Sequence, residues 1–304
     1  MLDVEFGVPQ GAVLSPLLFL LLTSDLPDEV VKGVDSTRGV AQYADDSTGY
    51  AASKSWDKTE EALSKMASNL EHYSYENGLH LNSSKTQKLK LGHAQTPTSD
   101  TLNVLGVTID KHINFNTHNE IVLRDIKKRL GVVRRLAVQL PRGKLLTEIG
   151  RALIIGKLQS CAFVTHNMRL SSREKGQAPN KGPAQVVLND LARLVLGARR
   201  TDHLRATDLM DRSGLSTLNE IVVNQSAVAA WQAVNGGALQ DVLEDFDSRT
   251  RGSASNLKKA TSQRCIPAQN MARAWNSSEA LRSAATLAEA RAVAKKMAKE
   301  ARHS

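Results

Sequence analysis

Cysteine is scarce in this chain, with only two among 304 residues, Cys161 and Cys265. Because they lie far apart and form no C-x-x-C pair, neither a disulfide framework nor a structural zinc site is indicated. Two isolated cysteines fit a reducing compartment. Aromatic residues make up only 4%, which argues against an aromatic-rich β-sandwich and weakly favours helices.

Long apolar runs are also lacking. The run from Leu17 to Leu22 is far too short to cross a bilayer. The first five residues, MLDVE, are acidic and carry no cleavage pattern of a signal peptide. We therefore expect a soluble, intracellular protein without a membrane partner. The sequence leaves open whether it resides in the nucleus or the cytoplasm.

Acidic residues are fewer than basic ones, so the formal net charge is +9 and the pI about 9.6. This basic excess fits a polyanionic partner such as nucleic acid, and equally an ordinary protein with a solvated Lys/Arg surface. Hydrophobic residues make up 41%, enough for one sizeable core or two smaller domains.

The order of expected elements is α+β first and all α afterwards. Ser15-Pro16 opens a helix whose leucines are apolar on all sides, so this helix should be buried. The pattern T-H-N-E at 117–120 predicts a capping box that opens a basic helix. The Pro/Gly-rich stretch 171–183 reads as a linker. Further expectations are a hairpin at 40–50, a helix at 57–77 stopped by Gly78, strands at 79–82, 89–91 and 102–109, and helices at 144–159, 184–196, 216–234 and 279–301.

The adjacent carboxylates Asp45 and Asp46 are the first chemical feature. Taken alone, an Asp-Asp pair is a common polar turn. Here it falls at the tip of a predicted hairpin, a rigid scaffold that projects both side chains. Two such carboxylates can hold Mg²⁺, a cation that prefers oxygen ligands. Two Mg²⁺ ions can activate a primer 3′-hydroxyl and stabilise the leaving pyrophosphate.

The second feature is the string GVPQG at 7–11, followed by AVLSP. Its glycines allow a close approach of the backbone to a nucleotide, and Gln10 offers both a donor and an acceptor. An ordinary loop ahead of a helix is the alternative interpretation.

GVPQGAVLSPLLF and then AQYADDSTGY resemble the palm of reverse transcriptases, and closely those of non-LTR retrotransposons of the jockey-like kind. GLHLNSSKTQ at 78–87 and LGVTID at 105–110 look like the next two palm motifs, in the family order. The resemblance implies a partial palm over 1–110, with an antiparallel sheet and packed helices. A helical thumb-like region would follow over 111–170, a linker over 171–183, and a C-terminal helical region over 184–304.

The resemblance also implies roles for single residues. Asp45 would be a main ligand of Mg²⁺, with Mn²⁺ as the alternative cation, and Asp46 its neighbour. Tyr43 would lie beneath the primer end, and Gly106 in the turn that grips the primer. Lys85 would stabilise or protonate the pyrophosphate, although a solvated surface lysine fits equally well.

The same resemblance assigns Pro9, Gln10 and Gly11 to the loop that contacts the template strand or the incoming nucleotide. The implied partners are an RNA template, a DNA primer and dNTPs, with the oligomeric state left open.

The family palm needs a third aspartate on a strand well before GVPQG, whereas only six residues precede Gly7 here. We therefore expect an N-terminally truncated reverse transcriptase with no, or negligible, polymerase activity of its own. Two alternatives stay open. One is a non-catalytic, basic nucleic-acid-binding remnant that uses the helices of 123–151 and the lysines near 295–299. The other is a non-functional relic.

Overall fold

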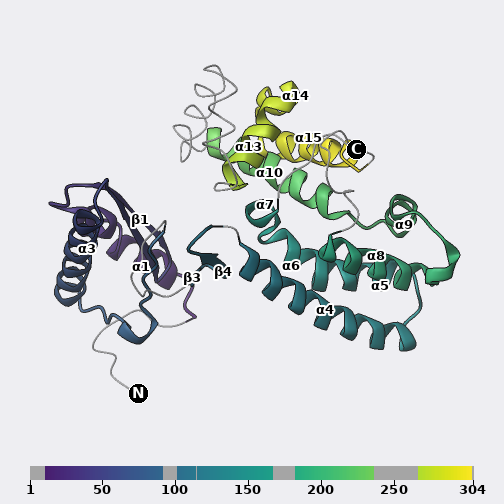
Figure 1. Ribbon diagram of the computed structural model, residues 1–304, viewed down its shortest axis with the longest axis horizontal. Helices are drawn as coiled ribbons and strands as arrows, with labels where there is room; N and C mark the ends of the chain where they lie inside the picture. The colour runs from purple at the N-terminus through teal and green to yellow at the C-terminus, as the bar shows by residue number, and fades with distance from the viewer. Residues whose placement is uncertain (1–10, 92–100, 114, 167–181, 236–265, 303–304) are drawn as a thin grey trace. The chain divides into compact units, whose positions relative to one another are not determined.

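The computed structural model describes residues 11–91, 101–113, 115–166, 182–235 and 266–302. The chain divides into two compact units (Figure 1). Unit 1 contains Met1–Lys88 and Val104–Gly106, and unit 2 contains Leu89–Asn103 and Val107–Ser304. Among the described residues, no helix combines the length and the apolarity that crossing a membrane requires.

Unit 1 pairs a β-hairpin with helices. Its strands are antiparallel, and the register runs from Thr37 opposite Ala52 to Tyr43 opposite Asp46. Gly78, with a φ of +64°, follows the long helix and confirms the expected helix stop. The described elements are α1 (Ser15–Leu22), α2 (Leu26–Val31), β1 (Thr37–Tyr43), β2 (Asp46–Ala52), α3 (Trp56–Glu76) and the 3-10 turn η1 (Ser83–Lys85).

The core of unit 1 lies between α3, α2 and one face of the hairpin. The partly buried Val40 and Ala51 contribute from β1 and β2. Because side chains alternate along a strand, the opposite face of the hairpin carries Tyr43 and Tyr50, whose exposed fractions are 69% and 56%. The buried apolar residues of this core are Leu26, Val30, Val34, Ala62, Met66 and Tyr73.

The expected burial of α1 is wrong. Ser15 is its one buried residue, and Leu18 and Leu21 are 49% and 63% exposed. Burial of an all-apolar helix requires a second layer to cover it, and the described residues of unit 1 place their core on α2, α3 and the hairpin instead.

Two expected strands are also absent from the described residues, since 79–82 and 89–91 have no strand structure. Their backbone pairs with no neighbouring strand, and a short apolar run needs such a partner to become one. The expected segment 102–109 is a hairpin instead, in which β3 (Thr101–Val104) and β4 (Val107–Asp110) flank a two-residue turn.

Unit 2 is helical after β4. Its long basic helix α4 (Asn116–Gln139) packs against β4 and α8 (Pro183–Leu196), and α8 matches the expected 184–196. The remaining described elements are α5 (Lys144–Gly150), the π-helical segment η2 (Arg151–Ile155), α6 (Gly156–Gln159), α7 (Ala162–Thr165), η3 (Arg200–Asp202), α9 (Ala206–Ser213), α10 (Leu218–Asn235), α13 (Ile266–Ser277), α14 (Glu279–Arg282) and α15 (Leu287–Glu300).

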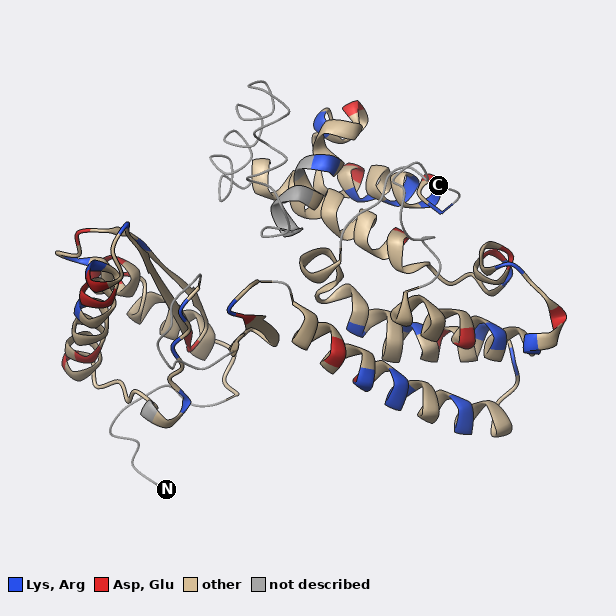
Figure 2. Cartoon of the chain, viewed as in Figure 1, with Lys and Arg blue, Asp and Glu red and all other residues tan. Residues whose placement is uncertain are grey.

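The core of unit 2 is continuous from α4 to α15. Ile126 and Val133 on α4, Leu188 and Leu191 on α8 and Val223 on α10 are fully buried. The apolar side of α4 therefore faces the core, while basic residues cover much of its other surface (Figure 2).

The capping box expected at 117–120 is wrong. Helix α4 begins at Asn116, and its N-cap Phe115 has a left-handed φ of 57° and no side-chain cap. The buried Asp110 instead organises the loop, because its Oδ2 accepts the Phe115 N–H at 2.8 Å and its Oδ1 accepts the His112 N–H at 2.9 Å. His118 is therefore an interior residue of the first turn, only 1% exposed.

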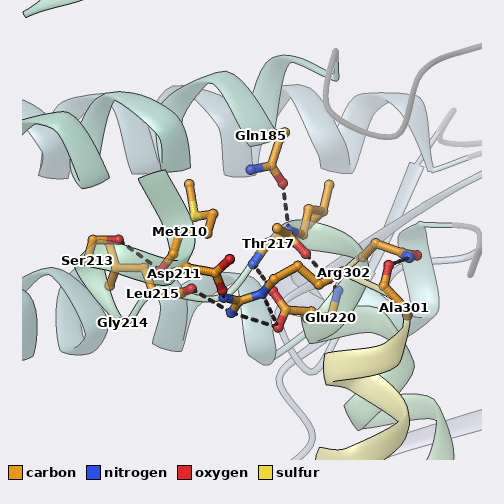
Figure 3. A network of polar contacts seen from close by, with 12 residues as sticks. Gln185, Met210, Asp211, Ser213, Gly214, Leu215, Thr217, Glu220, Ala301 and Arg302 are labelled. Carbon is orange, nitrogen blue, oxygen red and sulfur yellow. Dashed lines mark hydrogen bonds and ion pairs between the residues drawn. The ribbon is translucent and has the colours of Figure 1, made fainter. Parts of the chain in front are cut away.

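A capping box does form at the start of α10. Glu220 Oε2 accepts the Thr217 N–H at 2.6 Å, and Thr217 Oγ1 accepts the Glu220 N–H at 3.2 Å. Arg302, which follows α15, reaches the same place (Figure 3): its Nε donates to Glu220 Oε1 at 2.9 Å and it pairs with Asp211. The C-terminal helix is thereby tied to the start of α10.

Candidate active site

The tip of the β1–β2 hairpin brings together the residues that the sequence singles out. Tyr43 ends β1, Asp46 begins β2, and the two form the last cross-strand pair. Only Ala44 and Asp45 separate the strands, so the turn is a two-residue loop. Ala44 has a φ of +51°, a left-handed conformation that costs an L-residue about 1–2 kcal/mol.

Both carboxylates at the tip face solvent. Asp45 and Asp46 are exposed, and within the described part of the chain neither side chain forms an ion pair. Because directly opposite residues share a face of the sheet, Asp46 lies on the same exposed face as Tyr43. Two adjacent carboxylate oxygen donors suit a hard divalent cation. Among the described residues, however, no group of three or more His, Cys, Asp or Glu side chains is arranged to hold a metal ion.

Gln42 fixes the turn to the rest of unit 1. Its side chain lies on the core face of β1, and its Nε2 donates to Thr23 Oγ1 at 2.7 Å and to the Ala44 carbonyl at 3.3 Å. Thr23 is 2% exposed and its hydroxyl donates to the Phe19 carbonyl at 2.9 Å. The left-handed turn residue is therefore linked through one amide to the end of α1.

Tyr73 provides a second link at the end of α1. Its hydroxyl donates to Asp25 Oδ1 at 2.6 Å and lies 2.9 Å from the Leu22 carbonyl oxygen, which can share the same proton. Burial, followed by the hydrogen bond to Asp25, raises the pKa of Tyr73 to about 12. The phenol consequently stays a neutral donor at physiological pH and holds α3 against the segment that Gln42 also contacts.

The GVPQG string lies mostly outside the described residues, and this includes Pro9 and Gln10. Gly11 is described and has a φ of +88°, a conformation that favours glycine. A Cβ on Gly11 would meet no atom within 4 Å, so the requirement there is conformational and not steric.

Lys85 and Gly106 are exposed turn residues. Lys85 ends the 3-10 turn η1, and in the described residues no hydrogen bond or ion pair joins it to Asp45 or Asp46. Gly106 and Leu105 form the β3–β4 turn with φ values of +79° and +48°. Positive φ at both central positions is typical of a tight hairpin turn.

A pair of histidines, the buried His118 and the half-buried His166, was missed at the sequence level, because the eight histidines do not cluster along the chain. His118 Nδ1 accepts the Thr108 N–H at 3.1 Å, whereas its Nε2 is buried without a hydrogen-bond partner in the described structure. Burial, reinforced by the nearby His118, lowers the pKa of His166 to about 4. Burial also lowers the pKa of His118. Both rings are thus neutral at physiological pH.

Comparison with known families identifies the first third of the chain. Residues 3–109 match the family described as reverse transcriptase (RNA-dependent DNA polymerase). The matched segment contains the hairpin tip, Lys85 and Gly106. No curated protein and no solved structure matches the chain. At the level of the family, residues 3–109 therefore correspond to an RNA-directed DNA polymerase.

Proposed function

We propose that this chain is part of the reverse transcriptase of a non-LTR retrotransposon of the jockey-like kind. The observation that carries the proposal is the Tyr43–Asp46 tip, a tight turn that presents two exposed carboxylates within a segment matched to reverse transcriptases. The family match supports an RNA template, a DNA primer and dNTPs as partners. The assignment to the jockey-like group rests on the particular residues of the motifs GVPQG, YADD and GLHLN.

We further propose that 1–110 is a partial palm, 111–170 a thumb-like helical region, 171–183 a linker and 184–304 a C-terminal helical region. The change from hairpins to helices after β4 supports the first boundary.

Asp45 and Asp46 are proposed to hold Mg²⁺, with Mn²⁺ as the alternative. When bound, such ions supply activation of the primer 3′-hydroxyl and stabilisation of pyrophosphate. Tyr43 is proposed to support the primer end, because its ring shares the exposed hairpin face with Asp46. The amide of Gln42 restrains the backbone of the turn that carries both carboxylates.

The resemblance assigns further contacts to residues outside this tip. Pro9, Gln10 and Gly11 would contact the template strand or the incoming nucleotide. Lys85 would place a cation near the pyrophosphate, and Gly106 would allow the backbone of its turn to approach the primer. These roles follow the family resemblance residue by residue.

We expect the isolated chain to show no, or negligible, primer extension, because the resemblance requires a third aspartate beside Asp45 and Asp46. The measurement is extension of a DNA primer on an RNA template with Mg²⁺ and dNTPs. Robust extension that Asp45→Ala abolishes would contradict the expected inactivity while retaining the reverse transcriptase assignment.

Placement of the primer tests the assignment independently of turnover. A primer whose 3′ nucleotide carries 4-thiothymine, annealed to an RNA template, should crosslink to the peptide that contains Tyr43. Asp45→Asn with Asp46→Asn should reduce this crosslink in Mg²⁺, whereas the equally charged control Asp35→Asn with Asp57→Asn should not. Crosslinks that fall only on unit 2 peptides would contradict the proposal.

A non-catalytic nucleic-acid-binding remnant is the second candidate. Its supporting observation is a shallow hollow on the exposed side of α4, lined by Glu120, Leu123, Arg124, Lys127 and Lys128. Binding of nucleic acid without any crosslink at the hairpin tip would favour this candidate over the first.

A further inference from the structure

Three arginines from three segments of unit 2 converge on one carboxylate. Arg200 of η3 donates to Asp190 at 3.2 Å and 3.0 Å. Arg134 of α4 pairs with Asp190 Oδ2 at 3.2 Å, and Arg193 of α8 lies 3.6 Å from Oδ1. We call these three side chains, together with Asp190, the arginine cluster. It lies outside the matched segment 3–109.

Exposure differs sharply within the arginine cluster. The Asp190 side chain is only 13% exposed, whereas Arg134 and Arg200 are 56% and 73% exposed. Arg193 is intermediate at 25%. The carboxylate is therefore shielded beneath the guanidinium groups, and the two outer guanidinium groups face solvent.

The charge of the cluster is not balanced by its own members. Three guanidinium groups meet one carboxylate, which leaves a surplus of two positive charges. Each guanidinium has five N–H donors, while a carboxylate offers about four acceptor sites. More donors are present than Asp190 can satisfy, and a planar fork of such donors suits phosphate oxygens.

A fourth arginine extends the positive surface at the end of α8. Gly197 ends this helix with a φ of +70°, and a Cβ there would collide with the Arg142 guanidinium. Arg142 thus lies against the C-terminal end of the helix that carries Asp190 and Arg193. Lys and Arg residues recur along α4 (Figure 2), whereas Arg193 is the single basic residue of α8.

We propose that the arginine cluster binds the phosphate backbone of a nucleic acid strand. Asp190 acts as a clamp that holds the guanidinium groups in place, so less side-chain entropy is lost on binding. Other polyanions also carry phosphate groups, and we select nucleic acid because of the proposed reverse transcriptase function. The cluster would bind the strand independently of Asp45 and Asp46.

The test is the salt dependence of binding to a fluorescein-labelled DNA duplex, measured by anisotropy over a series of KCl concentrations. Arg134→Gln with Arg200→Gln should lower the slope of log K against log[salt] by about 1.8, since each lost duplex phosphate contact contributes about 0.9. Arg134→Lys with Arg200→Lys should retain most of the slope, because the charges remain.

Arg212→Gln with Arg291→Gln is the matched control, because it removes two exposed arginines of unit 2 that lie outside the cluster. An equal fall in slope for this control would overturn the proposal, since it would reflect net charge alone. Circular dichroism of each variant checks that unit 2 remains folded. An unchanged slope in folded Arg134→Gln with Arg200→Gln would also overturn it.

The outcome separates the cluster from the polymerase proposal. Asp45→Asn with Asp46→Asn should leave the effect of the cluster variants unchanged, even if the primer crosslink is lost. Loss of binding to phosphatidylserine vesicles in the cluster variants, with duplex binding intact, would assign the surface to membranes and overturn the inference.

Discussion

Removing Arg302 should destabilise unit 2 strongly. The Glu220 side chain is only 5% exposed and pairs with Arg302, which is itself 13% exposed. Arg302→Met would leave that carboxylate buried without its cationic partner, and such a loss typically costs about 3–5 kcal/mol. The bond from Arg302 to the Leu215 carbonyl at 3.1 Å would be lost as well. The Asp211 pair adds little, because Asp211 is 50% exposed.

The assay is urea unfolding followed by tryptophan fluorescence. Trp231 reports on unit 2, because its Nε1 donates to the Ala284 carbonyl at 2.9 Å. A Trp56→Phe background removes the exposed tryptophan of unit 1. Arg302→Met should lower the free energy of unfolding by about 3–5 kcal/mol, and Arg302→Lys by less.

A double-mutant cycle isolates the pair. Glu220→Gln keeps an acceptor for the Thr217 N–H but removes the charge that needs Arg302. The double variant with Arg302→Met should therefore be less destabilised than the sum of the single variants, by roughly 1–3 kcal/mol. Simple additivity, or a cost below about 1 kcal/mol for Arg302→Met, would refute the reasoning.

Three other changes have defined expectations. Gln42→Leu should remove about 1 kcal/mol of support from the hairpin turn, seen as roughly fivefold faster amide hydrogen exchange at Ala44. Because the folded-state pKa of His166, about 4, lies below the ordinary histidine pKa of 6.5, the unfolded state binds a proton at this site first as the pH falls. The contribution of neutral His166 to the free energy of unfolding should then be fully present above pH 6.5, and the free energy should fall by roughly 3 kcal/mol toward pH 4. The urea midpoint measured against pH follows this fall, and His166→Asn should flatten that profile. Gly150→Ala should cost about 1–3 kcal/mol by overpacking, measured as a lower urea midpoint, because its Cβ would lie 2.8 Å from Leu191 Cδ1.

The hairpin tip and the long helices could be predicted from local patterns. The hairpin expected at 40–50, the helix expected at 57–77 and the helix stop at Gly78 rest on short-range signals, and the structure has these elements within about three residues of the expected bounds. The β3–β4 turn was read as part of one strand, because Leu105 accepts a left-handed conformation that leucine rarely adopts.

Long-range contacts could not be predicted. Nothing in the sequence predicts the hydrogen bonds that Gln42 and Tyr73 form to the end of α1. His118 and His166 lie 48 positions apart in the chain. The arginine cluster depends on α4, α8 and η3 meeting at Asp190. The burial of α1 failed for a related reason, since apolarity does not specify which layer covers a helix.

Binding of Mn²⁺ at the hairpin tip tests the central claim most directly. In ¹⁵N-labelled chain, low Mn²⁺ should broaden the amide signals of Asp45, Asp46 and their neighbours before those of other acidic residues. Asp45→Asn with Asp46→Asn should remove this selectivity, while Asp35→Asn with Asp57→Asn should preserve it. Uniform broadening, or broadening centred elsewhere in unit 1, would contradict a metal site at the tip.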